Sequence, residues 1–233
     1  MTVEPTGQGN TGRWAAGDET TGQRAAGREA PGENAFDFSG GELCLDFANT
    51  ASHSRERPKE RLKSYRDLLA WGSQAGILND EDVRYLGQLA AEHPRKAAAA
   101  LADAIALREA LFRIVAAVIA GTPPKDQDLA KLNAALPRAL EHLRVSPRAK
   151  GCQWEWTGEE GALDRMLWPI ARSAADLLVS SEVERVRRCA NREECDWLFI
   201  DTTRNRSRRW CDMRSCGNRS KARRHYARKK AAR

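Results

Sequence analysis

The sequence predicts an α+β fold that is mainly helical, with a small antiparallel sheet and a short cysteine-rich unit at its C-terminal end. Apolar residues recur at helical spacing in several segments between residues 65 and 178. Four of the six cysteines lie close together, within residues 189–216. We therefore expect an N-terminal α+β domain over residues 35–183 and a second unit over residues 184–233.

Residues 1–34 differ in composition from the rest of the chain. They are rich in Gly, Thr, Ala, Arg and Glu, and Val3 and Trp14 stand out as large apolar side chains. Such a segment buries too little apolar surface to offset the entropy lost on ordering. We expect it to be disordered.

The N-terminal domain is expected to begin with a hairpin. Phe36 to Phe38 and Leu43 to Phe47 read as two short strands, and Ser39–Gly41 connects them. Glycine in this connection can take the positive φ that tight turns require.

Apolar spacing and end signals predict the helices that follow. The first contains Tyr65, Leu68 and Trp71 and ends near residues 72–76. The second begins after Asn79, because asparagine caps helix N-termini well. Apolar residues continue at helical spacing beyond it.

The longest helix is expected over residues 94–120. It has a broad apolar stripe and ends at Gly121-Thr122-Pro123-Pro124. A fourth helix passes through residues 129–136, and Pro137 is expected to kink it.

Two paired strands and a last helix complete the predicted N-terminal domain. In residues 143–146 and 153–157, apolar and polar side chains alternate, as they do along a strand. The last helix covers residues 163–178, with a bend or restart at Pro169.

Arg108 is an anomaly in the apolar stripe of the longest helix. It lies near the centre of the stripe, where an unpaired charge would be costly. One interpretation is that Arg108 pairs with a carboxylate such as Asp46 and bridges the first hairpin to the helix. The other is that Arg108, Asp46, Asn49 and Thr50 line a pocket for a small polar or anionic effector.

Charge is divided unevenly along the chain. Residues 184–233 contain 17 Lys/Arg and 6 Asp/Glu, a net charge of +11, whereas residues 1–183 contain 22 and 26, a net charge of −4. A basic end on an acidic body is typical of a domain that docks on a polyanion. The alternative is a solvated basic tail without a specific partner.

The clustered cysteines have metal-ligand spacing. Cys189, Cys195, Cys211 and Cys216 read as C-x5-C, then fifteen residues, then C-x4-C. Four thiolates suit the tetrahedral geometry of Zn²⁺ and leave no open position for a catalytic water. We therefore expect one structural Zn²⁺ per chain.

The residues around the cysteine pairs indicate which kind of zinc fold this is. Trp197–Ile200 suits a strand, residues 204–207 a polar turn, and Arg208–Trp210 a returning strand. After Cys216, residues 217–230 read as a basic helix. Knuckle, hairpin and helix in this order are typical of a treble-clef finger.

These motifs resemble the bacterial CGNR zinc-finger proteins, which usually carry an N-terminal domain called ABATE. The similarity rests on Cys216-Gly217-Asn218-Arg219 with Lys221, on Trp197-Leu198-Phe199 with Asp201, on Arg208-Arg209-Trp210, on Gly40-Gly41-Glu42-Leu43 and Leu45–Thr50, and on Leu107–Leu111. The first cysteine pair has one residue more than the usual C-x4-C of the family. The resemblance implies a transcription regulator that binds DNA.

The basic helix supplies the expected contacts to nucleic acid. Most of its cations should contact phosphates, which gives affinity without sequence preference. The expected contacts are Arg219, Lys221, Arg223, Arg224, Arg228, Lys229 and Lys230. Arg219 and Arg223 are the candidates for reading guanine edges. Alternatively, Asn218 caps the helix and Arg219 pairs with the thiolates or Asp201, which would make the motif architectural.

Three function classes follow from these patterns. The leading one is a zinc-dependent, DNA-binding transcription regulator whose N-terminal domain senses an effector or forms a homodimer. The alternatives are an RNA- or ribosome-associated zinc protein and a protein-interaction module. We expect no enzyme, because the sequence has no catalytic triad pattern, glycine-rich phosphate loop or HExxH motif.

The remaining sequence signals concern the compartment. No apolar run approaches the roughly 20 residues of a membrane helix. No hydrophobic N-terminal segment directs export, so we expect a cytoplasmic protein with reduced thiols. Cys44 and Cys152 are interpreted as small apolar residues.

Overall fold

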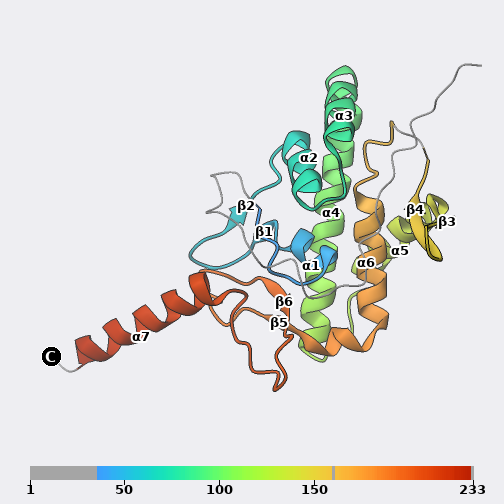
Figure 1. Ribbon diagram of the computed structural model, residues 1–233. Helices are drawn as coiled ribbons and strands as arrows, with labels where there is room; N and C mark the ends of the chain where they lie inside the picture. Colours follow the sequence, from blue (N-terminus) through green and yellow to red (C-terminus); the bar gives the residue numbers. More distant parts are fainter. Residues whose placement is uncertain (1–35, 159–160, 232–233) are drawn as a thin grey trace, which may run out of the picture.

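The computed structural model describes residues 36–158 and 161–231. Figure 1 shows a helical body from which the last helix projects to one side. The disorder expected for residues 1–34 lies outside the described residues.

The described part of the chain is mainly helical, with small antiparallel ribbons. Its helices are α1 (Leu43–Ala48), α2 (Tyr65–Gln74), α3 (Asp80–Glu92), α4 (Pro94–Ile119), α5 (Asp126–Glu141), α6 (Leu167–Val179) and α7 (Asn218–Ala231). Its two-stranded ribbons pair β1 (Ala51–Ser52) with β2 (Lys59–Glu60), β3 (Leu143–Pro147) with β4 (Cys152–Trp156), and β5 (Val186–Arg188) with β6 (Leu198–Ile200). The predicted α+β class is confirmed.

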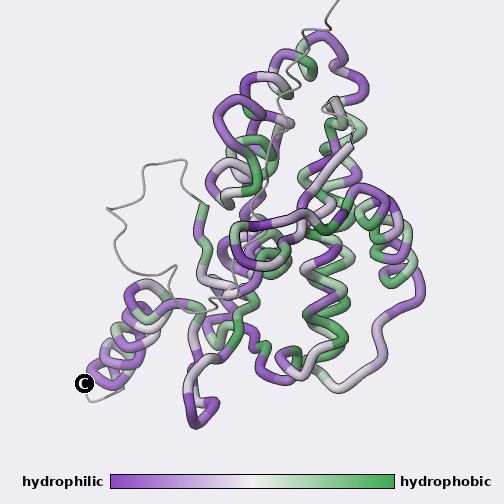
Figure 2. The backbone as a smooth tube through the Cα atoms, turned by 45° about the vertical axis from the view of Figure 1, so that its right-hand side comes forward, coloured by the Kyte–Doolittle hydropathy of each residue, from purple (hydrophilic) through white to green (hydrophobic). Residues whose placement is uncertain are grey.

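Helix α4 is the central element of the body and contacts α1, α2, α3, α5 and α6. Figure 1 shows it running the height of the body, with α3 beside its upper end. Capping boxes start α2 at Ser64 and α3 at Asn79, and the cap at Asn79 is the one that the sequence predicted. Apolar residues fill the space between these helices, and Figure 2 shows green on the body and mainly purple on α7.

The hairpin predicted for the first residues of the body is wrong. Residues 36–39 form no strand, and Leu43–Ala48 is helix α1. Helix α1 packs between α4 and α6, and its residues from Cys44 to Ala48 are all buried. A short apolar run that is buried on every side has no solvent face, so alternation cannot distinguish strand from helix.

The later elements follow the prediction more closely. The β3–β4 ribbon forms in the predicted segments, with Val145 opposite Trp154. Helix α5 contains Pro137. Helix α6 begins at Leu167, later than predicted, which places Pro169 in its first turn, where no intrahelical N–H bond is lost.

The hairpin predicted between the cysteine pairs is also wrong, because β6 pairs with a different strand. β6 pairs with β5, which precedes Cys189, and Arg208–Trp210 forms no strand. The carboxylate of Asp201 instead accepts the backbone N–H groups of Thr203 and Arg208, both at 2.9 Å. These bonds hold the returning segment as a loop.

The strand β6 joins the cysteine-rich unit to the body. Leu198 and Ile200 belong to the main hydrophobic core, whereas Phe199 packs among the cysteines. This alternation follows from the two-residue period of a strand. The side chain of Asn49 completes the junction, because its amide donates to Leu198 O and accepts from Leu198 N, both at 2.8 Å.

Candidate metal centre and nucleic-acid interface

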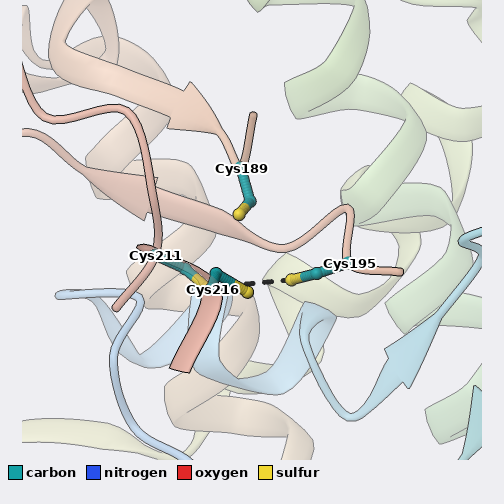
Figure 3. Close-up of side chains that lie close together, drawn as sticks. All are labelled: Cys189, Cys195, Cys211 and Cys216. Atoms are coloured by element: carbon teal, nitrogen blue, oxygen red, sulfur yellow. Dashed lines mark hydrogen bonds between the residues drawn. The ribbon is translucent and has the colours of Figure 1, made fainter. Parts of the chain in front are cut away.

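The four clustered cysteines converge on one point in the structure. Their sulfur atoms all lie within 4.8 Å of one another, and all four residues are buried. Figure 3 shows the side chains pointing toward one another from separate segments. Cys189 follows β5, and Cys195 closes the knuckle formed by residues 190–195. Cys211 precedes the turn before α7, and Cys216 lies within that turn.

The sulfur spacing fits a tetrahedral zinc site. The Cys195–Cys211 and Cys211–Cys216 Sγ–Sγ distances are both 3.7 Å. Zn–S bonds of about 2.3 Å in a tetrahedron place the sulfurs about 3.8 Å apart. The centre is therefore one structural Zn²⁺ with four thiolate ligands, as the sequence predicts.

The turn between the last two ligands also begins α7. The carboxylate of Asp212 accepts the backbone N–H groups of Arg214 and Ser215 at 3.2 and 2.8 Å. Residues 213–217 form a π-helical turn that runs directly into α7. The metal ligand Cys216 thus fixes the start of the basic helix.

Arg219 connects this helix to the metal ligands. Its Nη2 donates to Cys216 Sγ at 3.3 Å, and its Nε lies 3.4 Å from Glu194 Oε2. The hydrogen bond to the sulfur raises the pKa of Arg219, so the guanidinium remains charged beside the thiolates. The architectural interpretation of Arg219 agrees with these contacts.

We expect Arg219→Ala to weaken zinc binding by about tenfold to a hundredfold, because a donor that orients a metal ligand is lost. Competition with a chromophoric chelator measures this affinity. Arg224→Ala is the matched control, since Arg224 has no ion-pair partner among the described residues. Equal zinc affinities of the two variants would show that the Arg219 contact is incidental.

Arg223 is also held by the knuckle. Its Nη1 lies 2.7 Å from Glu193 Oε2, and its Nη2 lies 3.9 Å from Glu194 Oε2 and donates to Asn191 Oδ1. The acidic pair Glu193–Glu194 therefore neutralises the two arginines that the sequence singles out as base readers.

Three other cations of α7 lie on a different side of the helix. At about 100° per residue, Lys221, Arg224 and Arg228 share a side nearly opposite to that of Arg219 and Arg223. All three are exposed and have no ion pair with any described residue. Lys229 and Lys230 add exposed charge at the end of the helix.

Two family models match the chain. The ABATE model, described as "Putative stress-induced transcription regulator", matches residues 41–181, and the CGNR zinc finger model matches residues 185–229. The chain belongs to the ABATE family. No curated protein matches this ABATE chain. No helix within the described residues is both long and apolar enough to cross a membrane.

In the ABATE part, Arg108 is 2 % exposed and does not pair with Asp46 as predicted. Its Nη1 and Nη2 each bind a carboxylate oxygen of Glu60 at 2.6 Å, and Nη2 also binds Glu109 at 2.8 Å. Thr50 Oγ1 accepts a longer bond at 3.4 Å. The carboxylate of Asp46 instead accepts the Gly40 N–H at 2.7 Å.

The four residues predicted to line an effector pocket thus have different neighbours. Asn49 binds the backbone of β6, and Thr50 Oγ1 donates to Phe47 O at 2.8 Å. Arg108 and Thr50 come together, while Asp46 bonds to the loop before α1. A pocket for an effector at these residues remains a proposal.

Sequence reasoning missed the acidic partners at both sites, which are Glu60 and Glu109 around Arg108 and Glu193 and Glu194 beside α7. These glutamates are separated from their arginines by up to 48 positions, as for Glu60 and Arg108. The burial of Arg108 in an apolar stripe was the signal that a carboxylate must face it. It did not indicate which one.

Proposed function

We propose that this ABATE-family chain is a transcription regulator that binds double-stranded DNA through α7. In this proposal residues 184–233 bind DNA, and residues 35–183 form the domain that senses an effector or dimerises. The main support is the exposed basic side of α7 formed by Lys221, Arg224 and Arg228. The family description as a transcription regulator agrees with this role.

The shape of α7 suits the major groove of DNA. The helix has no buried residue among those described and leaves the body after its first turns, as Figure 1 shows. An α-helix with its side chains is about 10–12 Å wide, and the major groove is about 12 Å wide. The zinc centre holds only the first turns, so the rest of α7 is accessible to a duplex.

The contacts of α7 divide its cations by role. Arg219 and Arg223 are bound by the knuckle, so we propose that they position the helix on the zinc centre. Base reading then falls to Arg224 and Arg228, whose guanidinium groups have no ion pair among the described residues and can make bidentate bonds to guanine. Lys221, Lys229 and Lys230 are assigned to phosphates.

The placement of aromatic residues favours a duplex over single-stranded RNA. Recognition of single strands uses exposed aromatic rings on which bases stack. In the finger, Trp197 and Trp210 are partly buried and pack against the cysteine cluster. Tyr226 is 70 % exposed and is the large aromatic side chain that α7 offers.

We expect the triple variant Lys221→Ala, Arg224→Ala, Arg228→Ala to bind duplex DNA on the order of tenfold to a hundredfold more weakly than the parent chain. Lys221 is the one of the three that is assigned to a phosphate. Each phosphate contact contributes about 0.9 to the slope of log affinity against log salt, so the slope should fall by about 0.9. Fluorescence anisotropy of the zinc-loaded full chain over a salt series measures both quantities.

The control is a remote triple variant, Arg95→Ala, Lys96→Ala, Lys150→Ala, which removes the same charge from exposed residues at the start of α4 and in the β3–β4 turn. It should bind DNA as the parent does. Equal binding by the α7 variant and the parent would refute the proposed function. Stronger binding to duplex or single-stranded RNA than to DNA would instead favour an RNA-associated protein.

A further inference from the structure

The loop between β1 and β2 belongs to the ABATE part of the chain but lies against the zinc knuckle. The N–H of Glu56 donates to Glu193 O at 2.8 Å, and the N–H of His53 donates to Asp196 Oδ1 at 3.2 Å. Figure 1 shows β1 and β2 on the side of the body from which α7 projects. The two family modules therefore meet next to the base of the basic helix.

Glu194 marks this meeting point. Its Oε1 lies 4.0 Å from Arg57 Nη2, and its Oε2 lies 3.4 Å from Arg219 Nε and 3.9 Å from Arg223 Nη2. Three guanidinium groups, one from the loop and two from α7, thus surround a single carboxylate. Their total positive charge exceeds what Glu193 and Glu194 neutralise.

The loop and the first residue of β2 present exposed cations to solvent. Arg55, Arg57 and Lys59 are exposed, and the side chain of Arg57 is 63 % exposed. Arg55 and Lys59 form no ion pair with any described residue. These charges therefore contribute little to holding the described fold together, and they are available to an anionic partner.

Both ends of the loop are fixed to α4. Arg108 binds both carboxylate oxygens of Glu60 at the β2 end, and Glu109 Oε2 lies 3.1 Å from His53 Nε2 at the β1 end. A loop held in this way loses little conformational entropy when it binds a partner. Its cations keep a defined position relative to α7.

We propose that residues 53–59 form a second contact surface for the phosphate backbone of the duplex that α7 binds. Arg55, Arg57 and Lys59 would extend the basic surface beyond the base of α7, so that the ABATE part binds DNA together with the finger. This inference rests on the proposed function of α7. It assigns DNA contacts to a module whose net charge alone gives no such indication.

The test uses the zinc-loaded full chain and the triple variant Arg55→Ala, Arg57→Ala, Lys59→Ala. We expect its salt slope to fall by about 2 to 3 and its affinity to weaken about equally for all duplex sequences, since phosphate contacts are not sequence-specific. The variant Arg55→Lys, Arg57→Lys keeps the charge and should retain the parent slope. Zinc content and melting temperature should stay at parental values, because the three side chains are exposed.

The outcomes separate this inference from the proposed function. If the loop variant binds as the parent does while the α7 variant binds weakly, the loop contact is wrong and the role of α7 stands. If the remote triple variant lowers the slope as much as the loop variant, overall charge explains the effect and the loop contact is also wrong. If the α7 variant binds as the parent does, the proposed function itself fails.

Discussion

Replacing Cys211 and Cys216 with serine together should reduce zinc from one ion per chain to none and unfold the finger. These residues supply two of the four ligands, and Cys216 lies in the turn from which α7 starts. In small zinc domains the metal contributes on the order of 10 kcal/mol to folding. Without it, the small cluster of Phe199 and the cysteines cannot hold the finger in place.

The body should survive this change at reduced stability. Val186, Leu198 and Ile200 belong to the main core, so unfolding of the finger exposes part of it. Metal analysis, circular dichroism and DNA binding should therefore show lost zinc, a helical protein with a lower melting temperature, and lost affinity. Cys152→Ser, outside the cluster and exposed, is the control. Unchanged zinc content in the double variant would reject the ligand assignment.

The second large effect is expected at Glu60. Replacing it with glutamine should lower the free energy of unfolding by about 3 kcal/mol, the lower end of the range for breaking a buried ion pair. The reason is asymmetric burial: Arg108 is 2 % exposed and cannot reach water, whereas the side chain of Glu60 is 41 % exposed. After the change, Glu109 alone faces the buried guanidinium.

Arg108→Met should cost less than Glu60→Gln, because both glutamates can then turn to water. The double variant Glu60→Gln, Arg108→Met should also be more stable than Glu60→Gln alone. The coupling energy between the two substitutions should be about 1–3 kcal/mol. Asp46→Asn combined with Arg108→Met is the control and should be additive, since Asp46 does not pair with Arg108. Chemical denaturation of the parent, the three single variants and the two double variants measures these differences. Additivity of Glu60→Gln and Arg108→Met would contradict the observed pairing.

The same pair predicts how stability depends on pH. Burial raises the pKa of Glu60, but hydrogen bonds from Arg108 and from the Leu62 N–H outweigh it and hold the pKa below its usual value. A carboxyl group with a lowered folded pKa stabilises the protein above its unfolded pKa of about 4.3, and this is lost as the pH falls through the folded value. The stability gap between the parent and Glu60→Gln should therefore shrink below about pH 4.

The sequence by itself determined the metal centre and most of the helices. Four cysteines at C-x5-C and C-x4-C spacing match the four ligands of a tetrahedral Zn²⁺, and the structure brings their sulfur atoms together. Local signals were also sufficient to predict the start of α3 at Asn79 and the end of α4. Helix caps and glycine stops depend only on residues a few positions away. The family resemblance was visible at the same level.

Tertiary structure alone decided the remaining features, and the reason is that each depends on groups far apart in the chain. Leu43–Ala48 is a helix because α4 and α6 bury it on all sides, and β6 pairs with β5 because Val186, Leu198 and Ile200 complete the main core. Arg108 pairs with Glu60, which lies 48 positions away in the chain, and not with Asp46. Glu194 lies near arginines from both modules. Packing, and not the order of residues in α7, therefore decides which cations of this helix have ion pairs among the described residues.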